Sequence, residues 1–345
     1  MAAPKVFLTG TTGYIGGDGL YVLYQAHPDW EFSALVRTKE KATQLVSKFP
    51  KVRIVYGDLD SADILEEEAM KADIVYHFAD ADHAGSASAL LKGLSTHTPD
   101  RPGWYIHTSG TGLLLLDDIS AGSYGIHRSK VYDDWDGIGE VRLSIPDKAP
   151  HRKVDKIVLA GIGSPETVKT AIICPPVIYG PGRGSGNPHS VQAYRLAAAV
   201  LKRQKGFLVG EGNNIWHQVH IHDLSNAYLL LGEAAAAGGG SATWGKEGYY
   251  FAENGEFVWG DIQRAVAKAA FEKKLIPTEE VDILGKEQVE AVYPLGTILI
   301  GSNSRAHAIR AKKLLGWVPQ QPSLLELIPD IVDIEAQNLG LTGKE

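Results

Sequence analysis

The chain of 345 residues lacks several features that would tie it to an oxidising compartment or to a membrane. It has a single cysteine, Cys174, so it has no intrachain disulfide, and we expect a reducing, cytoplasmic location. Cys174 lies in an apolar run, which is typical of a buried thiol rather than a nucleophile. No apolar run approaches the roughly 18 residues of a membrane span, and no signal-peptide pattern opens the chain. We therefore expect no membrane partner.

Strong positive charge is also absent. The formal net charge is −7, and the longest basic cluster, HRKVDK at 151–156, is too short to follow a nucleic-acid backbone. With 44% hydrophobic and 22% charged residues, the composition is that of an ordinary globular protein. These numbers argue against nucleic acid as a main partner.

The first half of the chain alternates short β-branched runs with patterns of helical period. This alternation predicts βαβ units and an α/β fold with a Rossmann-type, doubly wound parallel sheet. The expected strands are 5–10, 31–37, 52–59, 73–80, 103–110 and 168–176.

The pattern loosens after Pro176, which predicts a second and smaller lobe. We expect a dinucleotide-binding domain over 1–180, with 215–235 packing back onto it, and a substrate lobe formed by 181–214 and 236–345. The Gly/Pro-rich stretch IYGPGRGSGNPHS at 178–190 is too long for a simple connection, and loops of this kind usually cover a ligand.

A glycine-rich turn, TGTTGYIG, follows the first expected strand and opens the first expected helix. Glycines allow the tight turn and let the backbone approach a pyrophosphate, which then rests on the helix N-terminus. Because the turn stands at the start of a βαβ series, it predicts a dinucleotide site.

The end of the second strand indicates which dinucleotide is bound. A site selective for NAD would place a carboxylate there for the ribose 2′-hydroxyl, but this chain has Arg37, with Lys39 and Lys41 close behind. A guanidinium can bind a 2′-phosphate through two hydrogen bonds. The sequence therefore predicts NADP (NADPH) as the cofactor.

Five motifs in order, TGTTGYIGG, GDLD, HTSG, PPVIYGPG and VHIHDLSNAYLLL, resemble the extended short-chain dehydrogenase/reductase superfamily. That superfamily includes nucleotide-sugar epimerases and dihydroflavonol-reductase-like enzymes, and the resemblance covers residues 4 to about 235. It implies a cofactor site in which the diphosphate, adenine, ribose and nicotinamide are held in turn. The residues implied at the diphosphate are Gly10, Thr12, Gly13, Tyr14 and Ile15. Those at the adenine are Asp58 and Leu59, and those near the ribose are Ala79 and Asp80. Those beside the nicotinamide are Thr108, Pro175, Val177 and Tyr179.

The catalytic positions of that family depart from its pattern. The family uses a Tyr with a Lys four residues later, on the helix after the fifth strand, and a Ser or Thr just after that strand. Counting back from the nicotinamide motif places the Tyr at His151 and the Lys at Asp155, while the Ser/Thr position falls on Gly110. We therefore expect an atypical member in which His151 and Asp155, helped by Thr111, replace the usual proton relay.

Two alternatives to this relay stay open. Tyr124, Tyr132 or Tyr179 could supply the hydroxyl, although none is followed by a Lys at the right spacing. His151 and Asp155 could also be no more than the solvated start of a helix. Of the three histidines of WHQVHIHD, His220 and His222 share one face of an expected strand and His217 takes the other, so we predict no metal site.

These observations together predict an NADP(H)-dependent oxidoreductase acting on a small carbonyl or alcohol metabolite. Two rival hypotheses remain: a non-catalytic NADP(H) sensor that regulates a partner protein, and an epimerase, dehydratase or cyclase without net redox turnover. The sequence is compatible with a homodimer.

Overall fold

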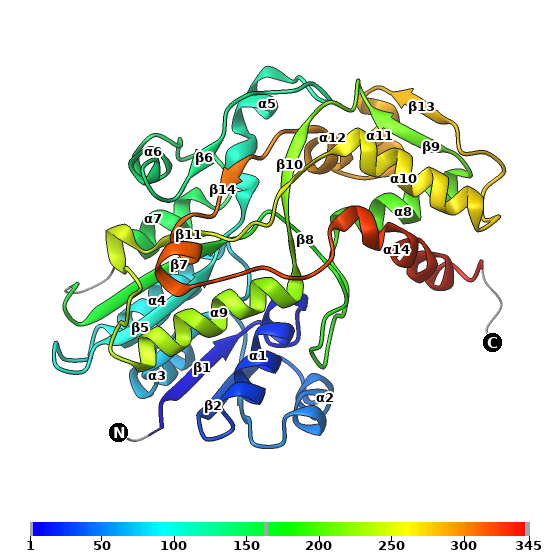
Figure 1. The fold of residues 1–345 in the computed structure, drawn as a ribbon. Coiled ribbons are helices and arrows are strands. Elements are labelled where there is room, and N and C mark those ends of the chain that lie inside the picture. Colours follow the sequence, from blue (N-terminus) through cyan, green and yellow to red (C-terminus); the bar gives the residue numbers. More distant parts are fainter. Residues whose placement is uncertain (1–2, 162–164, 342–345) are drawn as a thin grey trace.

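A computed structural model describes residues 3–161 and 165–341. Its centre is a seven-stranded sheet in the order β11-β7-β5-β4-β1-β2-β3, and every neighbouring pair is parallel. This confirms the predicted doubly wound architecture (Figure 1). The strands are β1 (Lys5–Thr9), β2 (Glu31–Val36), β3 (Arg53–Tyr56), β4 (Ile74–His77), β5 (Gly103–Thr108), β7 (Val168–Cys174) and β11 (Tyr249–Phe251).

Helices cover both faces of this sheet, as a parallel sheet with apolar strands requires. α1 and α9 pack against each other on one face, whereas α3, α4 and α7 form a layer on the other. The helices are α1 (Tyr14–Ala26), α2 (Lys39–Lys48), α3 (Ala62–Lys71), α4 (Ala84–Leu94), α7 (Arg152–Ala160) and α9 (Ile221–Ala236).

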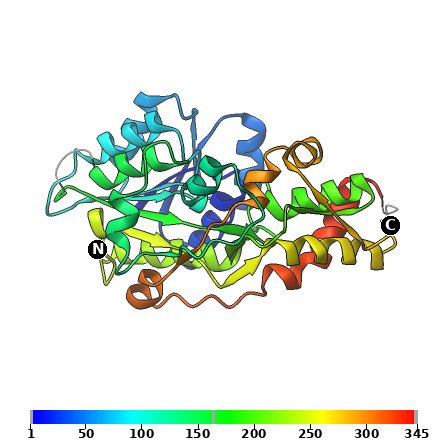
Figure 2. The same ribbon diagram turned by 90° about the horizontal axis from the view of Figure 1, so that it is seen from above.

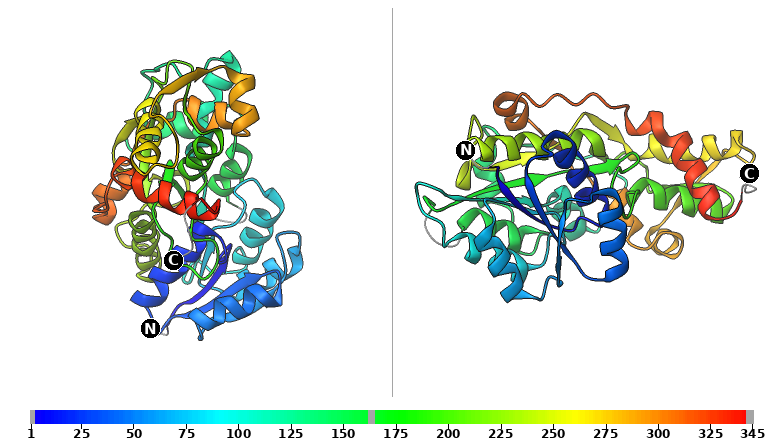
Figure 3. Two further views of the ribbon diagram at one scale, coloured as in Figure 1. Left: turned by 90° about the vertical axis from the view of Figure 1, so that its right-hand side faces the viewer. Right: turned by 90° about the horizontal axis from the view of Figure 1, so that it is seen from below.

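A smaller lobe stands at one end of the sheet, and Figures 2 and 3 show it from three further sides. It has its own apolar core, in which Leu196, Trp259 and Val332 are fully buried. Its strands are β8 (Val177–Tyr179), β9 (Gly206–Val209), β10 (Ile215–His220), β12 (Glu256–Val258) and β13 (Val281–Leu284). Its helices are α8 (Gln192–Arg203), α10 (Trp259–Glu272), α11 (Lys286–Val292), α12 (Gly296–Gly301) and α14 (Leu324–Asn338).

Segments from both halves of the chain connect the two lobes. β11 and α13, which the sequence-based division assigns to the smaller lobe, lie on the large sheet, where α13 contacts α9 and β11. The remaining elements are η1 (Thr111–Leu115), α5 (Leu116–Ala121), β6 (Tyr132–Asp133), α6 (Ile138–Leu143), η2 (Gly245–Glu247), β14 (Ala306–His307) and α13 (Arg310–Leu315). Within the described ranges, no helix has the length and apolar character needed to cross a bilayer.

Candidate functional site

The turn between β1 and α1 has the close backbone packing that a dinucleotide site needs. Gly10 has a φ of +76°, and the amide of Gly13 donates to its carbonyl over 2.9 Å. A Cβ on Gly16 would lie 2.4 Å from the Gly10 oxygen. Glycine is therefore required at both Gly10 and Gly16, and the turn brings α1 against the carboxyl end of β1.

The N-terminus of α1 is suited to an anion. Gly13 is its N-cap and has no side chain, and no acidic residue stands in its first turn. The amides of Tyr14 and Ile15 belong to the first turn, whose donors lack partners within a helix. Just before the helix, the buried Thr11 hydroxyl has no hydrogen-bond partner among the described residues. These groups fit a bound diphosphate.

Arg37 follows the last residue of β2 and is exposed, with no ion-pair partner in the described part of the chain. Thr38 caps α2 by accepting a hydrogen bond from the Lys41 amide over 3.4 Å, which fixes the backbone beside Arg37. An unpaired guanidinium at this edge of the sheet is free to bind a 2′-phosphate.

Asp58 and Leu59 lie at the carboxyl end of the neighbouring strand β3. The Asp58 carboxylate accepts a 2.8 Å hydrogen bond from the Ser61 hydroxyl, which lowers the pKa of Asp58 below its ordinary value. Asp58 is exposed and Leu59 is half-buried against the core, so both border the place where the resemblance implies the adenine.

The loop after β4 supplies the partner of His151. Ala79 is half-buried and Asp80 is exposed, and the Asp80 carboxylate accepts from the Asp82 amide over 2.9 Å. Asp82 Oδ1 in turn accepts the backbone amide of His151 over 2.9 Å and lies 3.1 Å from His151 Nδ1. The structure therefore pairs His151 with Asp82.

His151 is the N-cap of α7 and has a φ of +64°, so the chain enters the helix through a left-handed residue. This backbone turns the imidazole away from the helix and toward the loop after β5. Its Nε2 lies against Gly110 and Gly112, where an added Cβ would be 3.3 and 3.1 Å away. The Nδ1 nitrogen thus contacts the Asp82 carboxylate. The Nε2 nitrogen lies beside Gly110, the position at which the family has its catalytic Ser or Thr.

The structure does not hydrogen-bond His151 to Asp155, the partner that the sequence predicted. Asp155 is fully buried on the sheet side of α7, and its Oδ2 accepts a 3.0 Å hydrogen bond from the Tyr249 hydroxyl on β11. Burial raises the pKa of Asp155 to about 6, against the lowering effect of the Ser109 and Tyr249 hydroxyls. One turn of helix separates His151 from Asp155, but the left-handed N-cap directs the imidazole elsewhere.

The residues at the carboxyl end of β5 and in the loop after it face in several directions. The Thr108 hydroxyl lies 2.7 Å from that of Tyr228 on α9, so it is directed into the core rather than toward a cofactor. Thr111 is also buried: its amide donates to the Pro175 carbonyl over 3.0 Å, and its hydroxyl has no partner among the described residues. Thr111 therefore ties the loop after β5 to the loop after β7.

The resemblance implies that β8 lies beside the nicotinamide. Successive side chains of this strand point alternately into the smaller lobe and toward the large sheet. Val177 and Tyr179 are fully buried in that lobe's core, and the Tyr179 hydroxyl donates to the Pro322 carbonyl over 2.9 Å. Ile178 points the other way and is half-buried against the large core. Tyr179 is therefore not positioned to act as a substitute for the missing Tyr.

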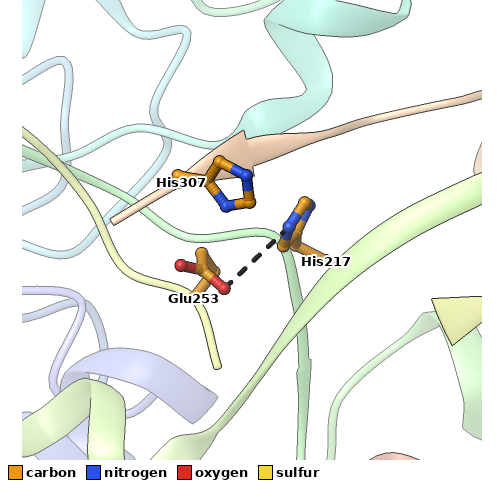
Figure 4. A group of neighbouring side chains, drawn as sticks. All are labelled: His217, Glu253 and His307. Carbon is orange, nitrogen blue, oxygen red and sulfur yellow. Dashed lines mark ion pairs between the residues drawn. The ribbon is translucent and has the colours of Figure 1, made fainter. Parts of the chain in front are cut away.

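Another group of ionisable side chains meets between the lobes, where His217 of β10, Glu253 after β11 and His307 of β14 approach one another (Figure 4). Their ligand atoms lie within 4.8 Å, with 4.0 Å between His217 Nε2 and Glu253. The Ala306 amide donates to His217 Nδ1 over 3.1 Å, so in the neutral imidazole the proton is on Nε2. In this arrangement the Ala306 amide engages Nδ1 and the proton occupies Nε2.

An open hollow of about 560 Å³ lies away from the glycine-rich turn and from His151. It is at the amino ends of β1, β2 and β3, opposite the glycine-rich turn, and includes Trp30, Arg53 and Glu68 in its wall. Arg53 and Glu68 form an ion pair there. Ligands of doubly wound sheets bind at the carboxyl ends of the strands, so we assign no site to this hollow.

Known proteins are similar to this chain in both sequence and fold, and the similarity in sequence covers 98% of the chain. No profile of a known protein family matches. An oxidase, ucsJ of Acremonium sp, is 39% identical over 98% of this chain and 99% of its own length. A dTDP-glucose 4,6-dehydratase of Mycobacterium tuberculosis is 23% identical over 65% of this chain and 67% of its own.

Solved structures show the same fold. DesIV, a dTDP-glucose 4,6-dehydratase of Streptomyces venezuelae solved with NAD and TYD bound, superposes with a TM-score of 0.66 at 18% identity, over 98% of this chain and 99% of its own. With a full-length relative, a shared fold and the ordered motifs, the chain belongs to the extended short-chain dehydrogenase/reductase superfamily, among its epimerase- and dehydratase-like enzymes.

Proposed function

We propose that the protein is an NADP(H)-dependent oxidoreductase that interconverts a small carbonyl compound and its alcohol. The observation that carries the proposal is the pairing of His151 with Asp82 at the carboxyl edge of the sheet. The full-length similarity to an oxidase favours net redox chemistry over the redox-neutral alternatives.

The cofactor would lie across the carboxyl ends of β1 to β5. The turn from Gly10 to Ile15 would hold its diphosphate, Asp58 and Leu59 its adenine, and Arg37 its 2′-phosphate. When bound, the nicotinamide supplies or accepts the hydride. The absence of a carboxylate at the position of Arg37 supports NADP over NAD.

His151 would move the proton that accompanies the hydride. With Asp82 accepting from Nδ1, the Nε2 nitrogen of the doubly protonated ring would donate its proton to a substrate oxygen, and the ring would take up a proton from solvent afterwards. The Asp82 carboxylate holds the ring in one orientation, because the same oxygen also accepts the His151 amide. Asp82 therefore acts as a positioning residue.

The test is turnover of NADPH with a panel of small aldehydes and ketones, and of NADP with the matching alcohols. We expect His151→Ala to lower kcat at least a hundredfold with little change in NADPH affinity, as loss of a general acid does. Asp82→Asn should lower kcat less, because it removes the group that orients the imidazole and keeps the imidazole itself.

His27→Ala is the matched control for this experiment. His27 pairs with Glu233 over 3.0 Å and its side chain is 24% exposed, as is that of His151, but it follows the far end of α1. This variant should keep full activity. A fully active His151→Ala would refute the relay, and tight NADPH binding with no turnover of any compound would favour the sensor hypothesis.

A further inference from the structure

A glycine-rich segment, residues 181–188, leaves β8 and folds back over the start of α1 (Figure 1). Gly184 lies against Gly17, where an added Cβ would be 2.7 Å from the Gly17 Cα. A Cβ on Gly186 would be only 2.2 Å from the Thr12 carbonyl oxygen, and the Asn187 amide donates to that same oxygen over 3.2 Å. We call residues 181–188 the strap, because they cross the turn proposed to hold the diphosphate.

An ion pair fixes the strap to α1. Asp18 is fully buried, and its carboxylate accepts from the Arg183 amide over 2.7 Å, from Nε over 3.1 Å and from Nη2 over 2.7 Å. The Ser225 hydroxyl on α9 donates to it over 2.6 Å. A carboxylate buried to this degree is costly without its cation, so the pair favours the closed strap strongly.

Further contacts hold the strap at its tip and its base. At the tip, Lys48 of α2 donates to the Gly184 carbonyl over 3.3 Å, and the Arg183 guanidinium lies 4.7 Å from the Tyr21 ring centre. At the base, the Tyr14 hydroxyl donates to the Gly180 carbonyl over 2.6 Å. The strap is therefore bound to α1 and α2 along its length, although it is a loop without regular structure.

We propose that the Asp18–Arg183 pair latches the strap over the diphosphate-binding turn and sets the rate at which the dinucleotide leaves. The proposal rests on the dinucleotide site of the proposed function. The strap touches Thr12 and Tyr14, which frame that site, so it forms a second wall beside the N-terminus of α1. Release of the cofactor past this wall requires the strap to lift, and lifting it separates the fully buried Asp18 carboxylate from the Arg183 guanidinium.

The experiment measures NADPH release by stopped-flow fluorescence after a chase with excess NADP. Arg183→Gln should raise the release rate at least tenfold. Arg101→Gln is the matched control, because Arg101 also binds an aspartate, Asp73, through Nε and Nη2, but at the opposite edge of the sheet. Its release rate should equal that of the wild type.

Two further variants separate release from folding. Asp18→Asn combined with Arg183→Gln removes both charges, so no lone carboxylate stays buried, and it should release NADPH as fast as Arg183→Gln while recovering thermal stability. Gly184→Ala keeps both charges but displaces the strap from α1, and it should also speed release. Hydrogen exchange of the strap amides in the cofactor-free protein should rise in all three variants.

The outcomes distinguish the strap from the cofactor site itself. Wild-type release rates in Arg183→Gln, the double variant and Gly184→Ala would overturn the latch while leaving NADPH binding intact. A wild-type protein that binds neither NADPH nor NADH would overturn the proposed function and the latch together.

Discussion

Replacing Asp155 with Asn should stabilise the protein at neutral pH, although the sequence marked this residue as catalytic. Burial raises the pKa of Asp155 from its ordinary 3.8 to about 6. The folded protein therefore holds this proton more tightly than the unfolded chain does. The contribution of Asp155 to the free energy of unfolding is therefore fully present at low pH, and it is lost as the pH rises from about 4 to about 6.

The size of the effect follows from the same two pKa values. The full difference corresponds to about 3 kcal/mol, of which about 2 kcal/mol is lost between about pH 4.5 and pH 7.5. Asn has no charge to bury, and its oxygen can accept the hydrogen bond from Tyr249 as the carboxylate does. Asp155→Asn should therefore lack this pH-dependent loss.

Urea unfolding of the wild type and of Asp155→Asn at both pH values measures the difference. Asp134 provides the control, since burial also raises its pKa to about 6. Its carboxylate accepts three backbone amides, those of Phe251, Ile309 and Arg310. In Asn one of the two carboxylate oxygens is replaced by an NH2 group, which cannot accept a hydrogen bond, so Asp134→Asn should destabilise by about 1–3 kcal/mol at both pH values. An Asp155→Asn protein that loses as much stability as the wild type between the two pH values would refute the reasoning.

Three further predictions concern the glycine-rich turn and the thiol. Gly16→Ala should lower NADPH affinity roughly tenfold or more, because the new Cβ would lie 2.4 Å from the Gly10 oxygen, and isothermal titration measures this. Tyr14→Phe should lower the free energy of unfolding by about 1 kcal/mol in urea titrations, since it loses the hydrogen bond to Gly180; an unchanged value would show that this bond contributes nothing net. Cys174 is fully buried and burial raises its pKa, so an aromatic disulfide reagent should label it only after unfolding.

The sheet and its glycine-rich turn could be predicted from the sequence because their signals are local. Runs such as residues 103–108 and 168–174 are apolar and β-branched, and each turn residue follows its strand directly. Such signals depend on neighbours in the chain. The division into lobes was harder to predict from the sequence, because β11 pairs with β7 in the large sheet although it lies 75 residues or more further along the chain.

The pairings within the site could not be predicted in the same way. The partner of His151 depends on one left-handed backbone angle, which directs the ring to Asp82, 69 positions earlier, instead of Asp155. The latch joins Asp18 to Arg183, 165 positions apart. A signal for Asp18 did exist, since a carboxylate stands in the apolar pattern of the first helix, and a buried acid there needs a cation from elsewhere.

The central claim is that Arg37 makes the dinucleotide site selective for NADP(H), and the most direct measurement is titration of NADPH and NADH into the wild type and Arg37→Ala. The wild type should bind NADPH about tenfold or more tightly than NADH, as expected for a charge-assisted contact at an exposed position. Arg37→Ala should lose this preference while keeping its NADH affinity, and Lys39→Ala, the neighbouring exposed cation, should keep it. Equal affinities for NADPH and NADH in the wild type would contradict the account.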